Sequence, residues 1–302
     1  MSPNTASGEP TGTAGPEQAS PGPAAPGLYV VATPIGNLRD ISLRALDVLR
    51  GADRIACEDT RVTAKLLSHY AITARTIAYN DHNAQRVLPD LIQRLKDGES
   101  LALVSDAGTP LISDPGYRLV TAAREADIPV HAIPGASALL AALASAGLPT
   151  DAFFFAGFLP PKQAARMRRL GKLATVPGTL VFYETGPRLA ESLADMAEVL
   201  GQRSAAVARE LTKLHEEVLR GTLVHLTKEL ANAPPLRGEI VVIVGPPVEE
   251  GADDDKVRAE LRNALENMSV RDAASEVAAQ TGRARREVYR MALELSGEDQ
   301  PE

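Results

Sequence analysis

The stretch Ser100-Leu-Ala-Leu-Val-Ser-Asp-Ala-Gly-Thr-Pro110 decides the fold, because it joins a short apolar strand directly to a loop of small, polar and glycine residues. A helical pattern over 116–126 follows, and Asp114-Pro115 offers that helix an acidic N-cap and a proline in its first turn. A strand, a tight loop and an amphipathic helix in this order are the repeating unit of a parallel sheet.

The same order of strand and helix continues on both sides of this stretch. Strands are predicted at 28–33, 54–57, 76–79, 100–105 and 130–133. Helices are predicted at 41–50, 60–68, 84–96, 116–126 and 136–146. Strands that alternate with helices in this way predict a mostly parallel sheet that is covered on both faces.

A second α/β run begins after the turn Gly147-Leu-Pro-Thr-Asp151. Its strands are predicted at 153–158, 179–184, 205–209 and 239–244, and its helices at 162–172 and 189–200. Further on, helical patterns over 269–280 and 285–295 resemble a helix-turn-helix. We therefore predict a disordered tail at 1–27, α/β domains at 28–148 and 149–248, a linker at 249–255 and a helical domain at 256–297.

The composition favours a globular protein of a reducing compartment. Of the 302 residues, 44% are hydrophobic, and the single cysteine, Cys57, excludes an intrachain disulfide. The tail has neither the basic start and apolar run of a signal peptide nor the arginines of a transit peptide. No apolar run approaches the roughly 20 residues that a membrane span needs. These features predict a cytoplasmic protein without a membrane partner.

The net charge of −7 is unevenly distributed. Ten of the 39 acidic residues lie in the tail, in the stretch 249–255 and in the last five residues. The 29 that remain are outnumbered by 32 lysines and arginines, so the predicted folded parts are slightly basic. An RNA partner is therefore compatible with the sequence.

Three loops rich in glycine, proline and small polar residues follow the first, fourth and fifth predicted strands. They are Thr33–Leu38, Ser105–Pro110 and Pro134–Ala138. Because ligands of parallel sheets bind outside the carboxyl ends of the strands, three such loops at one edge predict a ligand site.

Several enzyme classes lack their signatures in this chain. No G-x-G-x-x-G follows the first strand and no G-x-x-x-x-G-K-[ST] occurs, which disfavours dinucleotide oxidoreductases and P-loop enzymes. One cysteine and five scattered histidines do not give zinc spacing, so no metal is expected. The G-x-S-x-G turn of serine hydrolases is also missing.

Two long motifs resemble one known family. Val31-Ala-Thr-Pro-Ile-Gly-Asn-Leu38 and Ser105-Asp-Ala-Gly-Thr-Pro-Leu-Ile-Ser-Asp-Pro-Gly116 are similar to loops of the ribosomal RNA methyltransferases in the tetrapyrrole-methylase superfamily. The resemblance continues in order through Cys57-Glu-Asp-Thr-Arg61, Pro134–Ala138, Gly157-Phe-Leu-Pro160 and Arg209-Glu-Leu-Thr-Lys213. It covers residues 28–248, and the helical tail resembles the small C-terminal domain of the same family.

The resemblance implies two α/β domains of the tetrapyrrole-methylase type with a cofactor cleft between them, plus a small C-terminal helical domain. It implies an S-adenosylmethionine-dependent enzyme that methylates the 2′-oxygen of a cytidine in 16S rRNA near the decoding centre. The expected partners are 16S rRNA or the 30S ribosomal subunit, and a second copy in a homodimer. Carried over position by position, the cofactor contacts are Pro34, Ile35, Gly36, Asp106, Gly108, Thr109, Ile112, Ser137 and Ala138, with Tyr183, Leu211 and Gly238 from the second domain.

The substrate side is predicted from charged residues near the strand ends. Glu184, Arg209 and Lys213 are the candidate catalytic residues, and Arg61 and His82 are candidates for RNA contact. Further candidates for a base or a positioning residue are Glu58, Asp59, Glu210 and His215. The stretch 161–172 contains no acid, and its cations are expected to contact RNA phosphates rather than to form a solvated helix face. They are Lys162, Arg166, Arg168, Arg169 and Lys172.

Two alternatives and one departure remain open. A small-molecule methylase that acts on a tetrapyrrole would use the same fold, and a non-catalytic RNA-binding factor of ribosome assembly could have kept it. The helix-turn-helix, with Arg283, Arg285, Arg286 and Arg290, fits either RNA binding or plain packing. The family usually has a Pro-His-Arg triplet where this chain has Gly186-Pro-Arg188, which puts the role of that position in doubt.

Overall fold

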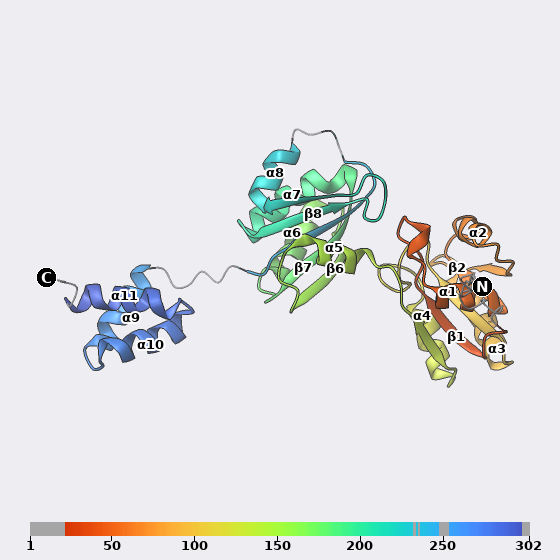
Figure 1. Ribbon diagram of the computed structural model, residues 1–302, viewed down its shortest axis with the longest axis horizontal. Helices are drawn as coiled ribbons and strands as arrows, with labels where there is room; N and C mark the ends of the chain where they lie inside the picture. The colour runs from red at the N-terminus through yellow and green to blue at the C-terminus, as the bar shows by residue number, and fades with distance from the viewer. Residues whose placement is uncertain (1–21, 232–233, 235, 248–253, 298–302) are drawn as a thin grey trace, which may run out of the picture. The chain divides into compact units, whose positions relative to one another are not determined.

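The computed structural model describes residues 22–231, 234, 236–247 and 254–297 (Figure 1). The predicted tail up to residue 21 and the predicted linker up to residue 253 lie outside the described residues. The described chain forms two compact units, one that ends at Gly245 and one that begins at Pro246. No helix in these residues is long and apolar enough to cross a membrane.

The first sheet is entirely parallel, as predicted. Its strands are β1 (Gly27–Val31), β2 (Arg54–Cys57), β3 (Thr76–Ala78), β4 (Ser100–Val104) and β5 (Val130–Ile133), in the order β3-β2-β4-β1-β5. The strands β4 and β1 are neighbours at the centre of the sheet, and β1 pairs on its other side with β5. The loops that follow these three strands therefore leave the sheet side by side, which is where a ligand is expected to bind.

Helices cover both faces of this sheet, which confirms the prediction. The helices α1 (Leu43–Gly51) and α2 (Thr60–His69) pack with Ile55 and the buried Cys57 on one face. The helices α3 (Ala84–Lys96) and α4 (Tyr117–Glu125) pack with Leu101 and Leu103 on the other face. A single 3₁₀ turn, η1 (Leu38–Asp40), ends the loop after β1.

The predicted start of α4 is wrong. Gly116 occupies the N-cap and the helix begins at Tyr117, so the Asp114-Pro115 pair lies before the helix rather than at its first turn. The Asp114 side chain lines a cleft instead of capping the helix. The sequence pattern that resembles a helix cap therefore contains a residue, Asp114, whose side chain lines the cleft.

The second sheet has mixed topology. Its strands are β6 (Phe153–Phe158), β7 (Thr179–Thr185), β10 (Glu239–Val244), β8 (Ser204–Arg209) and β9 (Glu217–Thr222), in that spatial order. Only β6 and β7 are parallel, and the remaining pairs are antiparallel. The strand β9 and the helix α8 (Leu223–Ala231) are absent from the sequence-based prediction.

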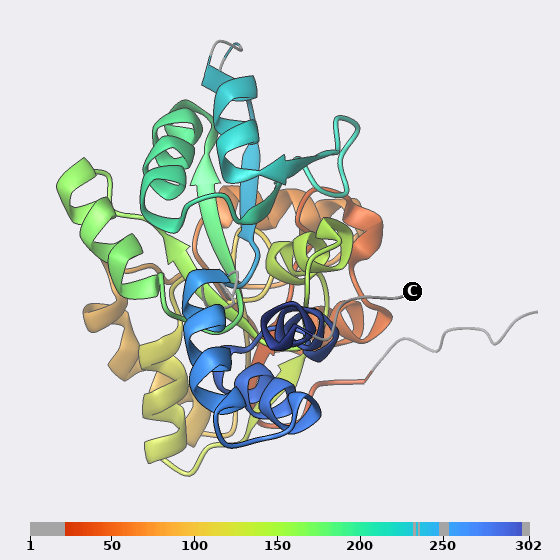
Figure 2. The same ribbon diagram turned by 90° about the vertical axis from the view of Figure 1, so that its left-hand side faces the viewer.

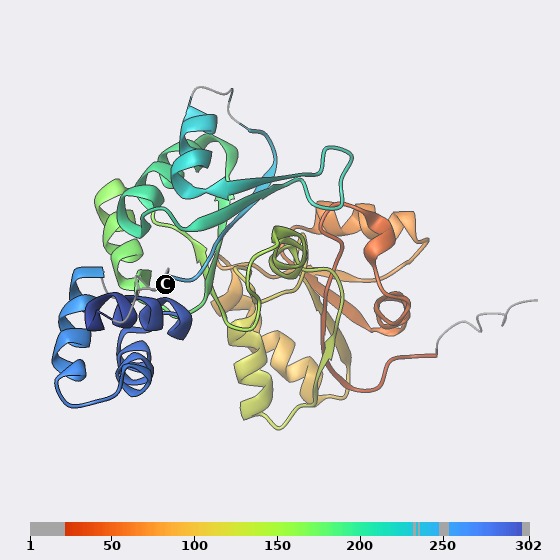
Figure 3. The ribbon, with the colours of Figure 1, turned by 60° about the vertical axis from the view of Figure 1, so that its left-hand side comes forward.

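Alternating side chains of the second sheet point into two separate cores, as the pleat requires. The helices α6 (Gln163–Leu173), α7 (Gly186–Leu200) and α8 cover one face. The other face packs against α5 (Ala138–Ala146), although α5 follows a strand of the first sheet in sequence. Figures 2 and 3 show α6–α8 on one side of the second sheet and α5 on the other.

The unusual triplet Gly186-Pro-Arg188 forms the first turn of α7, which starts three residues earlier than predicted. A Cβ atom at Gly186 would overlap the backbone carbonyl of Leu236. The backbone at Leu236 therefore lies so close to α7 that this position requires glycine. The Arg188 guanidinium donates a hydrogen bond to the Leu159 carbonyl at 2.7 Å. The departure from the family pattern therefore has a structural explanation in this chain.

The second unit is a three-helix bundle. It consists of α9 (Asp254–Leu265), α10 (Val270–Thr281) and α11 (Arg285–Ser296) around a small apolar core. Gly282, in the left-handed conformation at φ 68°, ends α10 and starts the short turn to α11. The predicted helix pair is confirmed.

Candidate active site

Hydrogen bonds join the three glycine-rich loops at the edge of the first sheet. Thr33 and Gly108 exchange both backbone hydrogen bonds, at 2.8 and 3.0 Å, and so connect the loop after β1 to the loop after β4. The Thr33 hydroxyl also donates to the Ser105 carbonyl at 3.1 Å. The Thr109 hydroxyl donates to the Ala136 carbonyl at 3.4 Å, which connects the loop after β5. The three loops thus form one connected wall.

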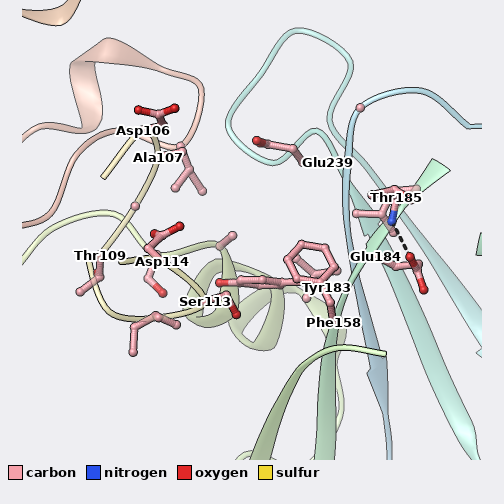
Figure 4. Close-up of a pocket in the computed structure, with 18 of the residues that line it drawn as sticks. Asp106, Ala107, Thr109, Ser113, Asp114, Phe158, Tyr183, Glu184, Thr185 and Glu239 are labelled. Carbon is pink, nitrogen blue, oxygen red and sulfur yellow. Dashed lines mark hydrogen bonds between the residues drawn. The ribbon is translucent and has the colours of Figure 1, made fainter. Parts of the chain in front are cut away.

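A cleft of about 350 Å³ lies against this wall, and strand ends of the second sheet close it. Figure 4 shows Asp106, Thr109 and Asp114 on one side, with Tyr183 and Glu239 on the other. Nine predicted cofactor residues line the cleft: Ile35, Asp106, Gly108, Thr109, Ile112, Ser137, Ala138, Tyr183 and Gly238. Its two walls come from the two α/β domains, as a cofactor site between them requires.

The remaining predicted cofactor residues lie nearby. Pro34 and Gly36 line an adjoining hollow of about 260 Å³, which shares Ile35 and Asp106 with the main cleft. Leu211 is 7% exposed and belongs to the apolar core that includes α5, so it supports the wall from behind.

Gly36 brings the two domains into contact beside the cleft. Its φ of 153° lies in the region that favours glycine, and an added Cβ would overlap the side chain of Lys213. The Lys213 ammonium binds Glu210 at 2.8 Å and Glu239 at 3.1 Å. Lys213 therefore neutralises acids at the rim and holds the loop of the second domain over the loop of the first.

The charge of the cleft is its most informative property. Five carboxylates line it, and no lysine or arginine is among the described residues that do so. They are Glu58, Asp106, Asp114, Glu184 and Glu239. Phe158 and Tyr183 add aromatic rings, with their centroids 5.6 Å apart. Arg188 and Lys213 pair with Glu184 and Glu239 from outside the lining, but Glu58, Asp106 and Asp114 have no ion-pair partner among the described residues. An acidic cleft with aromatic walls suits a cationic ligand and disfavours a phosphate group.

Comparisons with known proteins identify the family of this chain. The family model of tetrapyrrole (corrin/porphyrin) methylases matches residues 27–227, and that of the RsmI C-terminal HTH domain matches residues 251–296. Ribosomal RNA small subunit methyltransferase I of Mesorhizobium japonicum is 54% identical over 90% of this chain and 93% of its own length. The protein of the same name from Erythrobacter litoralis is 53% identical over 90% of this chain and 96% of its own.

The chain belongs to the ribosomal RNA small subunit methyltransferase I family. Its fold is that of the tetrapyrrole methylases. The crystal structure of a diphthine synthase has this fold too, with a TM-score of 0.55 at 19% identity over 72% of this chain and 89% of that one. The resemblance read from the loop motifs is confirmed.

Within this member of the methyltransferase I family, the predicted catalytic residues have different surroundings. Glu184 lies at the cleft but is 2% exposed, and Figure 4 shows its carboxylate bonded to the Thr185 amide. That carboxylate also accepts a hydrogen bond from Ser192 at 2.6 Å and lies 3.5 Å from Arg188. Arg209 pairs with Glu217 at 3.1 Å on the second sheet and is not among the residues that line the cleft.

The predicted RNA residues divide into exposed and buried ones. Arg61 has a side chain that is 88% exposed and pairs with Asp59, and His82 is exposed. Lys162, at the N-cap of α6, and Arg168 within the helix are exposed, and Arg169 is half-buried.

Arg166 requires a correction, because it is 2% exposed. Its guanidinium binds the buried carboxylate of Asp195 at 2.6 Å and the carbonyl of Pro161 at 3.3 Å. A cation inside the domain with these partners is not available to an RNA phosphate. Arg166 is a structural residue that connects α6 to α7.

Sequence reasoning counted Glu58 among the candidate bases, but it missed Asp114 as a candidate for the cleft wall or its chemistry. Burial raises the pKa of Glu58, and the nearby charges of Asp106 and Asp81 raise it further. Burial raises the pKa of Asp114 to about 6. The available signal for Asp114 was its place in the loop between β4 and α4, at the edge where the glycine-rich loops lie.

Proposed function

We propose that this chain transfers a methyl group from S-adenosylmethionine to the ribose 2′-hydroxyl of a cytidine in 16S rRNA, near the decoding centre. The observation that carries the proposal is the acidic, aromatic cleft, which contains no cationic side chain among the described lining residues. S-adenosylmethionine carries positive charge on its sulfonium and ammonium groups and has no phosphate, so it fits this cleft. The relatives' names supply the class of substrate.

The choice between RNA and a tetrapyrrole as the methyl acceptor does not rest on the charge of the cleft, because both are anions that carboxylates repel. The relatives' names favour RNA. Exposed cations outside the cleft, such as Lys162, Arg168 and Lys172, also suit an RNA backbone.

In this proposal, Asp106, Gly108 and Thr109 hold the cofactor from the first domain, and Tyr183 and Gly238 hold it from the second. When bound, the cofactor supplies an electrophilic methyl carbon on a positively charged sulfur. The two walls exclude water and fix the direction from which the ribose oxygen approaches. Such positioning can supply a large part of the rate enhancement of a displacement reaction.

Lys213 and Arg209 act as positioning residues in this proposal. Lys213 holds Glu210 and Glu239 at the rim of the cleft, and Arg209 fixes the end of β8 through Glu217. Together they set the position of the second wall.

RNA binding is assigned to exposed cations outside the cleft. Exposed charges for phosphate contact come from Lys162, Arg168 and Lys172, on and before α6, and from Arg61. The half-buried Arg169 and the exposed ring of His82 lie among the same predicted RNA residues. The proposed partners are 16S rRNA or the 30S subunit and a second copy of the chain, in the cytoplasm. Light scattering of the purified protein tests the homodimer.

The decisive experiment is transfer of labelled methyl groups to purified 30S subunits that lack the modification, followed by mapping of the labelled nucleotide. We expect label on the 2′-oxygen of one cytidine. Label on a base, on another RNA or on no RNA contradicts the proposal. Calorimetric titration with S-adenosylmethionine separates the enzyme from a non-catalytic RNA-binding factor, because the factor would not need to bind the cofactor.

A further inference from the structure

The five carboxylates of the cleft are not equivalent. Glu184 is held by hydrogen bonds and an arginine, and Glu239 is paired with a lysine. Asp106 accepts a hydrogen bond from a backbone amide at 3.1 Å. Among the described residues, Glu58 and Asp114 have neither an ion-pair partner nor a hydrogen bond from a backbone amide. These two are therefore the candidates for an exchangeable proton.

Asp114 occupies a special place on the cleft wall. Of the described residues, it alone lines both the main cleft and a smaller hollow of about 130 Å³. That hollow is also lined by Tyr79, Asp81, Tyr117 and Arg118. Tyr117 is 72% exposed, and an exposed aromatic ring beside an arginine suits a nucleotide base and its phosphate. A nucleotide that binds over this hollow would reach the cleft at Asp114.

We infer that Asp114 is the general base of the reaction and accepts the proton of the ribose 2′-hydroxyl. The inference rests on the proposed function. In the step, the 2′-oxygen forms a bond to the methyl carbon, and the bond from that carbon to sulfur breaks with its electron pair remaining on sulfur. The hydroxyl proton moves to a carboxylate oxygen of Asp114 and then to water. No other reactant is needed.

The electrostatic surroundings of Asp114 suit this role. Burial raises the pKa of Asp114 to about 6, a hydrogen bond from Ser105 opposes the shift, and the charges of Glu58 and Asp106 add to it. The titratable and charged groups around it come from several elements: Glu58, Tyr79, Asp81, Asp106, Arg118, Tyr183 and Glu239. A base with a pKa just below neutral is unprotonated at the working pH and still basic enough to take a proton.

The test compares Asp114→Asn and Asp114→Glu with the wild-type chain in single-turnover methylation of 30S subunits that lack the modification. We expect Asp114→Asn to lower the rate by about 100-fold or more, the usual contribution of a general base, and Asp114→Glu to restore part of it. The wild-type rate should fall tenfold per pH unit below about 6, and this acid limb should be absent in Asp114→Asn. Calorimetry should show that the affinity for S-adenosylmethionine falls far less than the rate, by less than about tenfold, because the other four cleft carboxylates remain.

Two further measurements do not depend on the turnover of Asp114→Asn. Glu58→Gln removes a like charge, so the pKa of Asp114 should fall, and the acid limb should move to lower pH. Carboxyl ¹³C NMR of the full chain should show one aspartate that titrates near pH 6, and its signal should be missing in Asp114→Asn. Asp97→Asn, an exposed acid after α3, is the matched control and should leave rate and limb unchanged.

A wild-type rate and acid limb in Asp114→Asn would overturn the inference. A loss of rate that is matched by a loss of cofactor affinity would also overturn it, because Asp114 would then be a cofactor contact. If the wild-type chain itself transfers no methyl group to the 2′-oxygen, the proposed function fails first.

Discussion

The helices α6 and α11 carry similar runs of basic residues, but the structure uses them differently. In α6, Arg166 points into the domain and binds the buried Asp195. In α11, Arg285, Arg286 and Arg290 are all exposed, and none of them forms an ion pair within the described residues. The number of cations in a helix therefore does not tell how many of them can bind RNA.

The difference follows from the position of each cation on its helix. Arg166 lies on the same stripe as Leu170 and Leu173, at the i, i+4, i+7 spacing of a buried face. A charged residue on that stripe is stable only with a buried partner of opposite charge, which α7 supplies. The buried residues of α11 are Val288, Met291 and Ala292, and its arginines lie outside that stripe.

The largest effect is expected at Arg166. Arg166→Ala leaves the Asp195 carboxylate buried without its cation, which should lower the free energy of unfolding by about 3–5 kcal/mol in urea denaturation. Lys162→Ala, an exposed cation next to the same helix, should change it by less than about 0.5 kcal/mol. A small loss in both variants would mean that the buried pair does not hold α6 to α7.

The second prediction concerns α11. Replacing Arg285, Arg286 and Arg290 together by alanine should weaken binding to a 16S rRNA fragment about tenfold or more, and should reduce the slope of log K against log salt by about two. The urea midpoint should remain that of the wild type. Filter binding at several salt concentrations measures both quantities, and an unchanged slope would make the helix pair a packing module.

The third prediction extends the comparison to a buried acid. Glu184→Gln removes the charge that faces Arg188 and weakens the hydrogen bond from Ser192, so the free energy of unfolding should fall by about 1–3 kcal/mol. Thermal unfolding measures this loss. If Glu184 were a catalytic base instead, this variant would fold with normal stability and lose the acid limb of the rate profile.

The smallest effect is expected for the exposed cations of α6. The double variant Lys162→Ala with Arg168→Ala should lower RNA affinity only a few-fold, because two phosphate contacts at most are removed. Cofactor affinity, measured by calorimetry, should not change. An effect as large as that of the α11 variant would mean that α6 is the main RNA contact.

Much of the fold could be predicted from the sequence because the strands of the first sheet are short, apolar and bounded by glycines. Strands β2 and β5 have the predicted bounds, and the helix α3 does too. The strand β9, Glu217–Thr222, was missed because its apolar residues do not alternate and Gly221 interrupts it. Its pairing with β8 over the whole strand, a tertiary contact, makes it a strand.

The sequence could predict which loops form the site, but not which charged side chains are buried and which line the cleft. The loops after β1, β4 and β5 do form one wall, as their composition indicates. The burial of Glu184 and Arg166 was not predictable, because it depends on which partner the neighbouring helix supplies. Asp114 was assigned to a helix cap, since the same residue type suits a cap and a catalytic carboxylate.

The packing of α5 has a consequence for synthesis of the chain. The helix ends at Ala146, but the strands that cover its apolar side, β8 and β10, begin only at Ser204 and Glu239. During translation the Ala142–Ala146 side of α5 therefore leaves the ribosome long before its partners, and it stays exposed until β10 has been made. A nascent chain that stops before β10 would expose the apolar side of α5, which favours aggregation. A fragment cut after residue 148 would keep that apolar side exposed permanently.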